Sequence, residues 1–263
     1  MPGDNTRLLE VSGLRVRVPG RVLVDGLDMT LEQGEFIAVL GRNGTGKTLS
    51  LLTLAGLREM DGGAVRLGGA AIGSLRRQQV AKRLALLPQD TDDIFPATVL
   101  DTALVGRHPH IGRFRWESPQ DFEHARASLA QVGMEELANR DVLSLSGGER
   151  RRLAIAQVLT QSPEVYLLDE PTNHLDPQHQ VDTLNVFRQA ADNGAGVIAS
   201  LHDVNLAARV ADRCLLLFGD GRWEFGMTDE VLDEERLEAL FDTPMEAVRW
   251  RDRQLFIAGS GPP

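Results

Sequence analysis

The residues with the clearest potential for chemistry form one glycine-rich stretch. They are Gly41, Arg42, Asn43, Gly44, Thr45, Gly46, Lys47 and Thr48. This is the pattern G-x-x-x-x-G-K-[ST], in which glycines let successive backbone N–H groups turn toward a phosphate. Lys47 can reach the β- and γ-phosphates, and the Thr48 hydroxyl can ligate Mg²⁺. The stretch therefore predicts a site for a nucleoside triphosphate, rather than a turn that only joins two elements.

Two carboxylates, Asp169 and Glu170, directly follow the apolar run 165–168. The run is typical of a buried strand, and ligands bind at the carboxyl edge of a parallel sheet. We expect Asp169 to hold Mg²⁺, directly or through water, and Glu170 to act as the general base toward an attacking water. For the pair taken alone, helix capping is the alternative interpretation.

A second candidate anion site consists of Ser146, Gly147 and Gly148, which precede a helical pattern at 149–161. Backbone N–H groups at a helix N-terminus attract phosphate. The alternative is a simple N-cap, because Ser146 followed three residues later by Glu149 matches the capping box.

The elements around these motifs predict an α/β fold. The apolar run 36–40 leads as a strand into the glycine loop, and 49–55 continues as a helix. Residues 8–35 alternate apolar runs with turn signals, which indicates antiparallel strands. Later strand-like runs are separated by helical patterns, which implies a parallel sheet with helices on both faces. The strand-like runs are 84–87, 165–168, 196–200, 215–218 and 223–225, and the helical patterns are 74–83, 177–192 and 203–211.

We expect one domain over residues 1–263 with four parts. The parts are an antiparallel β subdomain at 1–35 and 64–72, a nucleotide-binding core at 36–63, 73–88 and 162–225, a helical subdomain at 89–161, and a C-terminal cap at 226–263. The leucines among the charged residues of the last part predict an amphipathic cover for the core.

The composition excludes several classes of protein. A formal charge of −10 argues against a nucleic-acid-binding surface. Cys214 is the only cysteine, so no intramolecular disulfide or cysteine-based zinc site can form, and we expect it buried in a strand. The N-terminus shows no signal-peptide pattern, and no apolar run approaches the roughly 20 residues that span a bilayer.

The motifs, in this order, resemble those of the ATP-binding cassette (ABC) ATPases over nearly the whole chain. Leu145-Ser146-Gly147-Gly148-Glu149 resembles the family's signature motif, and 173–176 resembles its D-loop. Gln89 is similar to the Q-loop glutamine, which links Mg²⁺ and water to a transmembrane partner. His202 matches the switch histidine, which contacts the γ-phosphate, although a lone histidine is more often structural.

The resemblance implies a P-loop NTPase core with an antiparallel β subdomain and a helical subdomain. It also implies a head-to-tail homodimer in which the phosphate loop of one copy faces Ser146–Gly148 of the other across ATP. The implied catalytic residues are Glu170, His202 and Gln89, and the implied Mg²⁺ ligands are Thr48, Gln89 and Asp169. One departure is Val18, which stands where family members usually have an aromatic residue to stack on adenine.

Residues 98–114 narrow the resemblance to one branch of the family. Gly106-Arg107-His108-Pro109-His110 and Gly112-Arg113-Phe114 resemble segments of importers of iron–siderophore complexes, haem and cobalamin. The implied partners are two multi-span membrane permease subunits contacted through 89–114 and, indirectly, a periplasmic or surface substrate-binding protein. The implied location is the cytoplasmic face of the inner (plasma) membrane.

Four alternatives remain at this stage. The 106–114 segment could be an arginine-rich surface loop. His108 and His110 could instead hold a metal ion, although the sequence near them offers no carboxylate or cysteine as a further ligand. The protein could instead be a soluble ABC ATPase of the iron–sulfur-assembly type. It could also be an ABC subunit for another substrate, including an exporter.

Overall fold

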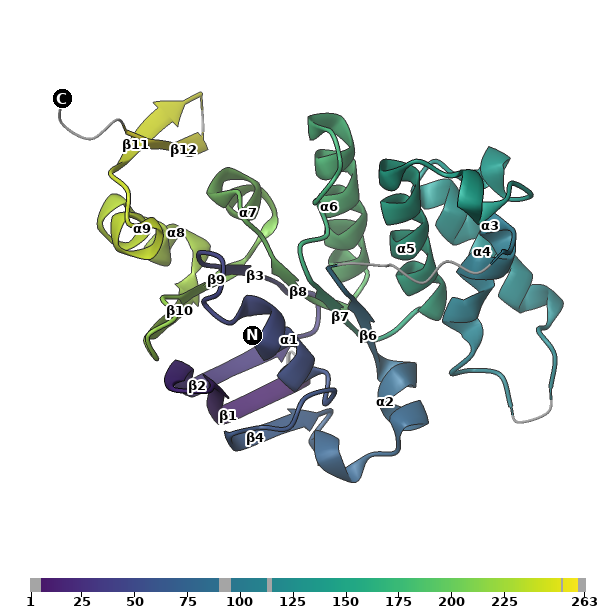
Figure 1. Ribbon diagram of the computed structural model, residues 1–263, viewed down its shortest axis with the longest axis horizontal. Coiled ribbons are helices and arrows are strands. Elements are labelled where there is room, and N and C mark those ends of the chain that lie inside the picture. Colours follow the sequence, from purple (N-terminus) through teal and green to yellow (C-terminus); the bar gives the residue numbers. More distant parts are fainter. Residues whose placement is uncertain (1–5, 90–95, 113–114, 252, 260–263) are drawn as a thin grey trace.

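A mostly parallel sheet runs through the centre of the computed structural model (Figure 1), which describes residues 6–89, 96–112, 115–251 and 253–259. The strand order is β10-β9-β3-β8-β7-β6. The strands are β3 (Phe36–Leu40), β6 (Leu84–Leu87), β7 (Val165–Leu168), β8 (Gly196–Ser200), β9 (Arg213–Leu217) and β10 (Trp223–Met227). All neighbours pair in parallel except β10, which is antiparallel to β9. The parallel strands are buried at nearly every position, as expected for strands covered on both faces.

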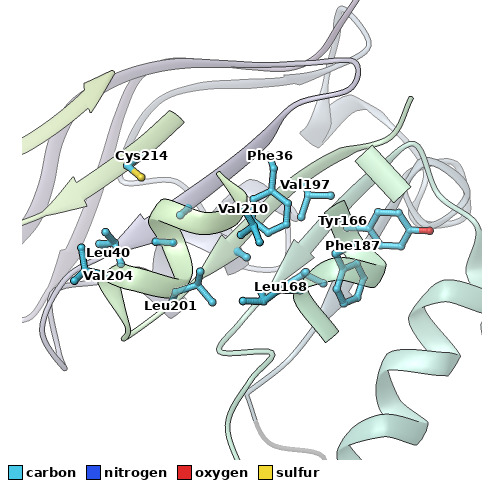
Figure 2. Close-up of a cluster of buried hydrophobic side chains, with 14 of the residues drawn as sticks. Phe36, Leu40, Tyr166, Leu168, Phe187, Val197, Leu201, Val204, Val210 and Cys214 are labelled. Carbon is cyan, nitrogen blue, oxygen red and sulfur yellow. The ribbon is translucent and has the colours of Figure 1, made fainter. Parts of the chain in front are cut away.

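The α-helices of the described chain are α1 (Lys47–Leu54), α2 (Arg77–Arg83), α3 (Val99–Leu104), α4 (Pro119–Gln131), α5 (Gly147–Gln161), α6 (Pro177–Asp192), α7 (Val204–Val210), α8 (Thr228–Val231) and α9 (Glu234–Phe241). Several of these helices cover one face of the central sheet. Side chains of α5, α6, α7 and α9 form one buried cluster with residues of the sheet. Figure 2 shows part of this cluster, including Phe36, Leu168 and Phe187. Tyr166 contacts Phe187 edge to face, with ring centroids 5.4 Å apart. Cys214 is buried in the same cluster on β9, as the sequence predicts.

The other face of the central sheet also carries a helix, as predicted, but strands cover it as well. A second, antiparallel sheet covers it together with α1. Its strands, in the order β2-β1-β4-β5, are β1 (Arg7–Val18), β2 (Arg21–Glu32), β4 (Gly62–Leu67) and β5 (Ala70–Ala71). Ile37 and Ile198 of the central sheet belong to the same buried cluster as Leu14 of β1 and Leu51 of α1. Long strands that are apolar on one side can bury that side against a sheet as well as a helix can.

A third apolar cluster lies between α3, α4 and α5 (Figure 1), within the segment predicted to be helical. Helix α5 contributes Leu153 and Ala156 to this cluster and Ile155 and Val158 to the cluster on the central sheet. Helix α5 therefore joins the helical part to the core.

The C-terminal segment contains a β-hairpin that its sequence pattern did not predict. Strands β11 (Met245–Trp250) and β12 (Arg253–Ala258) follow α9, whose Leu237 and Leu240 are buried as predicted. The side chain of Asn205 on α7 bonds to both the backbone N–H and the carbonyl of Phe256, at 2.8 and 3.0 Å. Among the described residues, no helix has the length and apolar character needed to cross a bilayer.

Candidate nucleotide-binding site

The glycine loop lies between β3 and α1, as predicted. Gly46 caps α1 with φ 105°, and a Cβ at this position would lie 3.1 Å from the Leu23 Cβ. Only glycine combines this left-handed backbone with so close a neighbour. The Thr45 hydroxyl donates to the Arg42 carbonyl at 2.9 Å and closes the loop. The loop is therefore a fixed turn that leads directly into the helix N-terminus.

Lys47 is the buried cation of this loop. It is 5% exposed, and its Nζ donates to the carbonyls of Gly41 at 2.8 Å and Arg42 at 3.3 Å. Burial lowers the pKa of Lys47, while the carboxylates of Glu170 and Asp169 oppose that shift. A cation held here between the loop and two carboxylates is suited to contact a phosphate that enters the cleft.

A cleft of about 610 Å³ opens over the loop. The loop residues that line it are Asn43, Gly44, Gly46, Lys47 and Thr48. Four other predicted site residues line it as well: Val18, Gln89, Glu170 and His202. Val18 and Arg21 are paired across the β1–β2 turn, and both line the cleft. The cleft thus brings together residues from five separate parts of the sequence.

Sheet register explains why these distant segments meet. Leu87 pairs with Leu168, and Leu168 pairs with Ala199, so β6, β7 and β8 end at the same level. The residues that follow these strands, including Gln89 and Asp169, must then lie at one edge of the sheet.

Asp169 lies beside the cleft, where it lines a smaller cavity of about 240 Å³. Thr48 and Gln89 line both cavities. A hydroxyl, an amide and a carboxylate around one small space are the oxygen donors that Mg²⁺ prefers, so the residues present fit this ion.

Ser200, the last residue of β8, was not singled out from the sequence. Its hydroxyl donates to Asp169 Oδ1 at 2.7 Å and accepts from the Glu170 N–H at 2.9 Å. Ser200 and Asp169 are 0% and 2% exposed. The one available signal was a polar residue at the end of an apolar strand. The bridge fixes the direction in which both carboxylates leave the sheet.

Glu170 is buried, at 6% exposed, and has a left-handed backbone with φ 48°. Its Oε1 lies 2.5 Å from His202 Nε2, and its Oε2 accepts a hydrogen bond from the Asn173 side chain. A non-glycine residue in this region is strained and persists only where its surroundings hold it. Asn173 lies in the D-loop-like segment, but its contact with Glu170 was not foreseen. The two neighbours orient the carboxylate predicted to be the general base.

Ser146, Gly147 and Gly148 lie elsewhere. Ser146 is the N-cap of α5 and forms the capping box with Glu149, with N···O distances of 3.3 and 2.7 Å. Ser146 and Gly147 are exposed, and none of the three residues lines the cleft. A Cβ on Gly148 would lie 3.6 Å from the His174 carbonyl. A single copy of the chain therefore does not bring this turn to its own nucleotide site.

Part of the 106–114 segment is tied to the helical part. Arg107 forms an ion pair of 2.8 Å with Asp121, and this hydrogen bond, together with those from Ser118, lowers the pKa of Asp121 to about 2. His110 Nε2 lies 2.8 Å from the Gln161 carbonyl, and burial lowers the pKa of His110. In the described ranges no three histidine, cysteine or acidic side chains gather to hold a metal. Arg113 and Phe114 lie outside the described residues, as does 90–95 of the predicted permease contact.

Fold and site together define a P-loop protein with a site for a nucleoside triphosphate. The model of the ABC transporter family matches residues 24–173. A hemin import ATP-binding protein of Deinococcus radiodurans is 44% identical over 214 residues, which cover 80% of each chain. A cobalamin import ATP-binding protein of Halobacterium salinarum is 38% identical over 89% of this chain, which spans only 58% of that relative's length.

Among solved structures, an ABC transporter described as being of the metal-chelate type, in an inward-facing conformation, superimposes with a TM-score of 0.84. It is 28% identical, with 97% of this chain and 98% of that chain covered. This protein belongs to the ABC transporter family. The predicted family and the predicted fold, an ABC ATPase with antiparallel β and helical parts, are thereby confirmed.

Proposed function

We propose that this protein is the ATP-hydrolysing subunit that powers import of a metal chelate, namely an iron–siderophore complex, haem or cobalamin, through a membrane partner. The observation that carries the ATPase activity is the meeting of the glycine loop, Gln89, Glu170 and His202 in one cleft. The substrate class is supported by relatives named for hemin and cobalamin import. It is supported too by the likeness to a transporter of the metal-chelate type.

The chemistry follows from the side chains in the cleft. Lys47 and the loop N–H groups bind the phosphates, and Mg²⁺ held by Thr48, Asp169 and Gln89 would neutralise their negative charge. The Glu170 carboxylate, whose Oε1 contacts His202, accepts a proton from the attacking water as the water oxygen bonds to the γ-phosphorus and the bond to the leaving oxygen of ADP breaks. Because the Glu170 carboxylate is buried and held on both oxygens, it is aimed before ATP arrives.

A homodimer completes the proposed site. Ser146 and Gly147 are exposed at the N-terminus of a fifteen-residue helix, where backbone N–H groups favour phosphate. Since they do not line the cleft of their own chain, they contact the nucleotide of a second copy in a head-to-tail pair. Two ATP molecules then hold the dimer, and hydrolysis removes the charge that both surfaces bind, so that the dimer opens.

The proposed partners are two multi-span permease subunits, contacted through 89–114 at the cytoplasmic face of the inner membrane. A periplasmic or surface binding protein delivers the substrate. The proposed domain consists of an antiparallel β subdomain, a nucleotide-binding core, a helical subdomain and a C-terminal cap. Helix α5, which packs on both the core and the helical cluster, is the element that would transmit motion between them.

The test is reconstitution with the membrane protein encoded beside this chain. Purified complex in proteoliposomes should take up hemin, cobalamin or a ferric siderophore only with Mg-ATP, and Lys47→Ala should abolish uptake. Uptake of none of these, with ATP hydrolysis intact, would disprove the substrate class. Recovery of the protein only in a soluble complex would instead favour an assembly ATPase.

A further inference from the structure

The second arginine after the exposed turn, Arg151, is buried on the first turns of α5, at 4% exposed. A guanidinium carries five N–H donors in one rigid plane. Its Nη1 donates to the carbonyls of Pro88 at 2.7 Å and Gln89 at 3.1 Å. These two residues directly follow strand β6 and bring the Gln89 side chain to the cleft.

The same guanidinium also holds the segment that follows β7. Nη2 donates to the carbonyls of Asp169 at 2.8 Å and Glu170 at 2.7 Å, and Nε donates to the carbonyl of Pro171 at 3.3 Å. One planar group on α5 therefore binds the backbone of two segments that lie about eighty residues apart in the sequence.

The hydrogen bond from Arg151 to the Glu170 carbonyl helps to hold the strained backbone of Glu170. The Glu170 carbonyl accepts from Arg151 and also from the Asn173 N–H at 3.1 Å, while its own N–H is held by Ser200. Strained φ values persist where several contacts over-determine them. Without the guanidinium, the Glu170 carbonyl keeps only the contact from the Asn173 N–H, so the backbone that aims the carboxylate at His202 is held less tightly.

We propose that Arg151 is a positioning residue for ATP hydrolysis. It joins the Gln89 segment, the 169–171 segment and the N-terminal turn of α5 into one unit. Helix α5 moves when Ser146–Gly148 bind the nucleotide of a partner copy. Through Arg151, this movement places Gln89 and Glu170 in their working positions at the same time. This inference rests on the proposed ATPase function. Lysine cannot replace Arg151, because its three donors surround a single nitrogen and cannot span both segments.

The test compares Arg151→Lys with Arg152→Lys in the full-length protein. Arg152 lies on the same helix but donates to the carbonyls of Val132 and Gly133, away from the cleft. For Arg151→Lys we expect kcat to fall roughly 10- to 100-fold, the scale of a misplaced catalytic group. The KM and Kd for ATP should stay within about threefold, because the phosphate loop is untouched. Arg152→Lys should keep the kcat of the wild type.

Hydrogen exchange is the second measurement and does not depend on turnover. Arg151→Lys should raise amide exchange in peptides that contain Gln89 and in peptides that contain 169–173, and Arg152→Lys should raise neither. Should Arg151→Lys not fold, Arg151→Gln, which has two amide donors and no charge, is measured in the same way.

Three results would overturn the inference. The first is a kcat for Arg151→Lys within twofold of the wild-type value, with unchanged hydrogen exchange. The second is a loss of ATP affinity and thermal stability in Arg151→Lys together with the loss of kcat. The third is a fall of kcat in Arg152→Lys as large as that in Arg151→Lys. If the wild-type protein hydrolyses no ATP, alone or with its membrane partner, the proposed function is contradicted instead. Hydrogen exchange in Arg151→Lys then still shows whether Arg151 joins the two segments.

Discussion

Glu170→Gln separates the chemical step from every other property of the site. Glutamine keeps the shape of the side chain and removes the basic oxygen. Its amide oxygen can accept from Asn173, and its amide nitrogen can donate to His202 in the imidazole tautomer that leaves Nε2 as the acceptor. The two neighbours of Glu170 therefore keep their hydrogen bonds. We expect the free energy of unfolding to change by no more than about 1 kcal/mol.

Turnover should respond far more strongly. Loss of a positioned general base lowers the rate roughly 10²- to 10⁴-fold, which corresponds to about 3–5 kcal/mol in the activation free energy. Binding of ATP should be retained, because the glycine loop and Lys47 are unchanged. The ATP-bound dimer should then accumulate, since the step that opens it is blocked.

Light scattering with Mg-ATP, paired with a phosphate-release assay, measures both consequences. The variant should form a dimer only with ATP, and Lys47→Ala should stay monomeric as the control for nucleotide binding. Turnover by Glu170→Gln at the wild-type rate would refute the role of Glu170 as the base. A monomer at saturating ATP would refute a composite site closed by nucleotide in the isolated protein.

Three further predictions concern the surroundings of the site. Ser200→Ala leaves the buried N–H of Glu170 without its acceptor and should lower the free energy of unfolding in urea by about 1–3 kcal/mol. Val18→Tyr adds a ring beside the cleft and should tighten ATP binding roughly 2- to 10-fold in calorimetry. Asp121→Asn weakens the pair with Arg107 and should destabilise the protein by about 1–3 kcal/mol at pH 7. The folded-state pKa of Asp121 is about 2, below its ordinary value of 3.8. The extra stability of the wild type over Asp121→Asn is therefore present above about pH 4 and is lost as the pH falls toward 2.

Each of these predictions has a result that contradicts it. Ser200→Ala with wild-type stability would mean that water replaces the hydroxyl. Tripolyphosphate is the control ligand for Val18→Tyr, and equal tightening for it and for ATP would exclude stacking on the base. For Asp121→Asn, a difference from wild type that persists at pH 2 would show that the aspartate acts by packing rather than by charge.

Local sequence was enough to predict the phosphate-binding part of the site. The glycine loop, the strand before it and the helix after it are consecutive, so their geometry depends on neighbouring residues and on the φ values open to glycine. The capping box at Ser146 is local in the same way, and the structure contains it. The buried strands were recognisable because a strand covered on both faces is continuously apolar.

Contacts between distant segments could not be predicted in the same way. The positions of Ser200 and Arg151 beside the carboxylates depend on strand order and on where α5 crosses the sheet edge. Nothing in the run of three arginines at 150–152 distinguishes the one whose guanidinium is buried. The cover of the second face by a sheet also depends on which apolar surfaces meet in space.

The sequence by itself therefore determined what this protein binds, because a phosphate loop is a property of eight consecutive residues. The tertiary structure decided how the carboxylate of Glu170, the predicted general base, is held. Register between β7 and β8 places Ser200 beside Asp169, and α5 places one guanidinium behind two segments. Such contacts arise only when the chain has packed, since hydrogen bonds between remote segments follow from the burial of the elements that carry them.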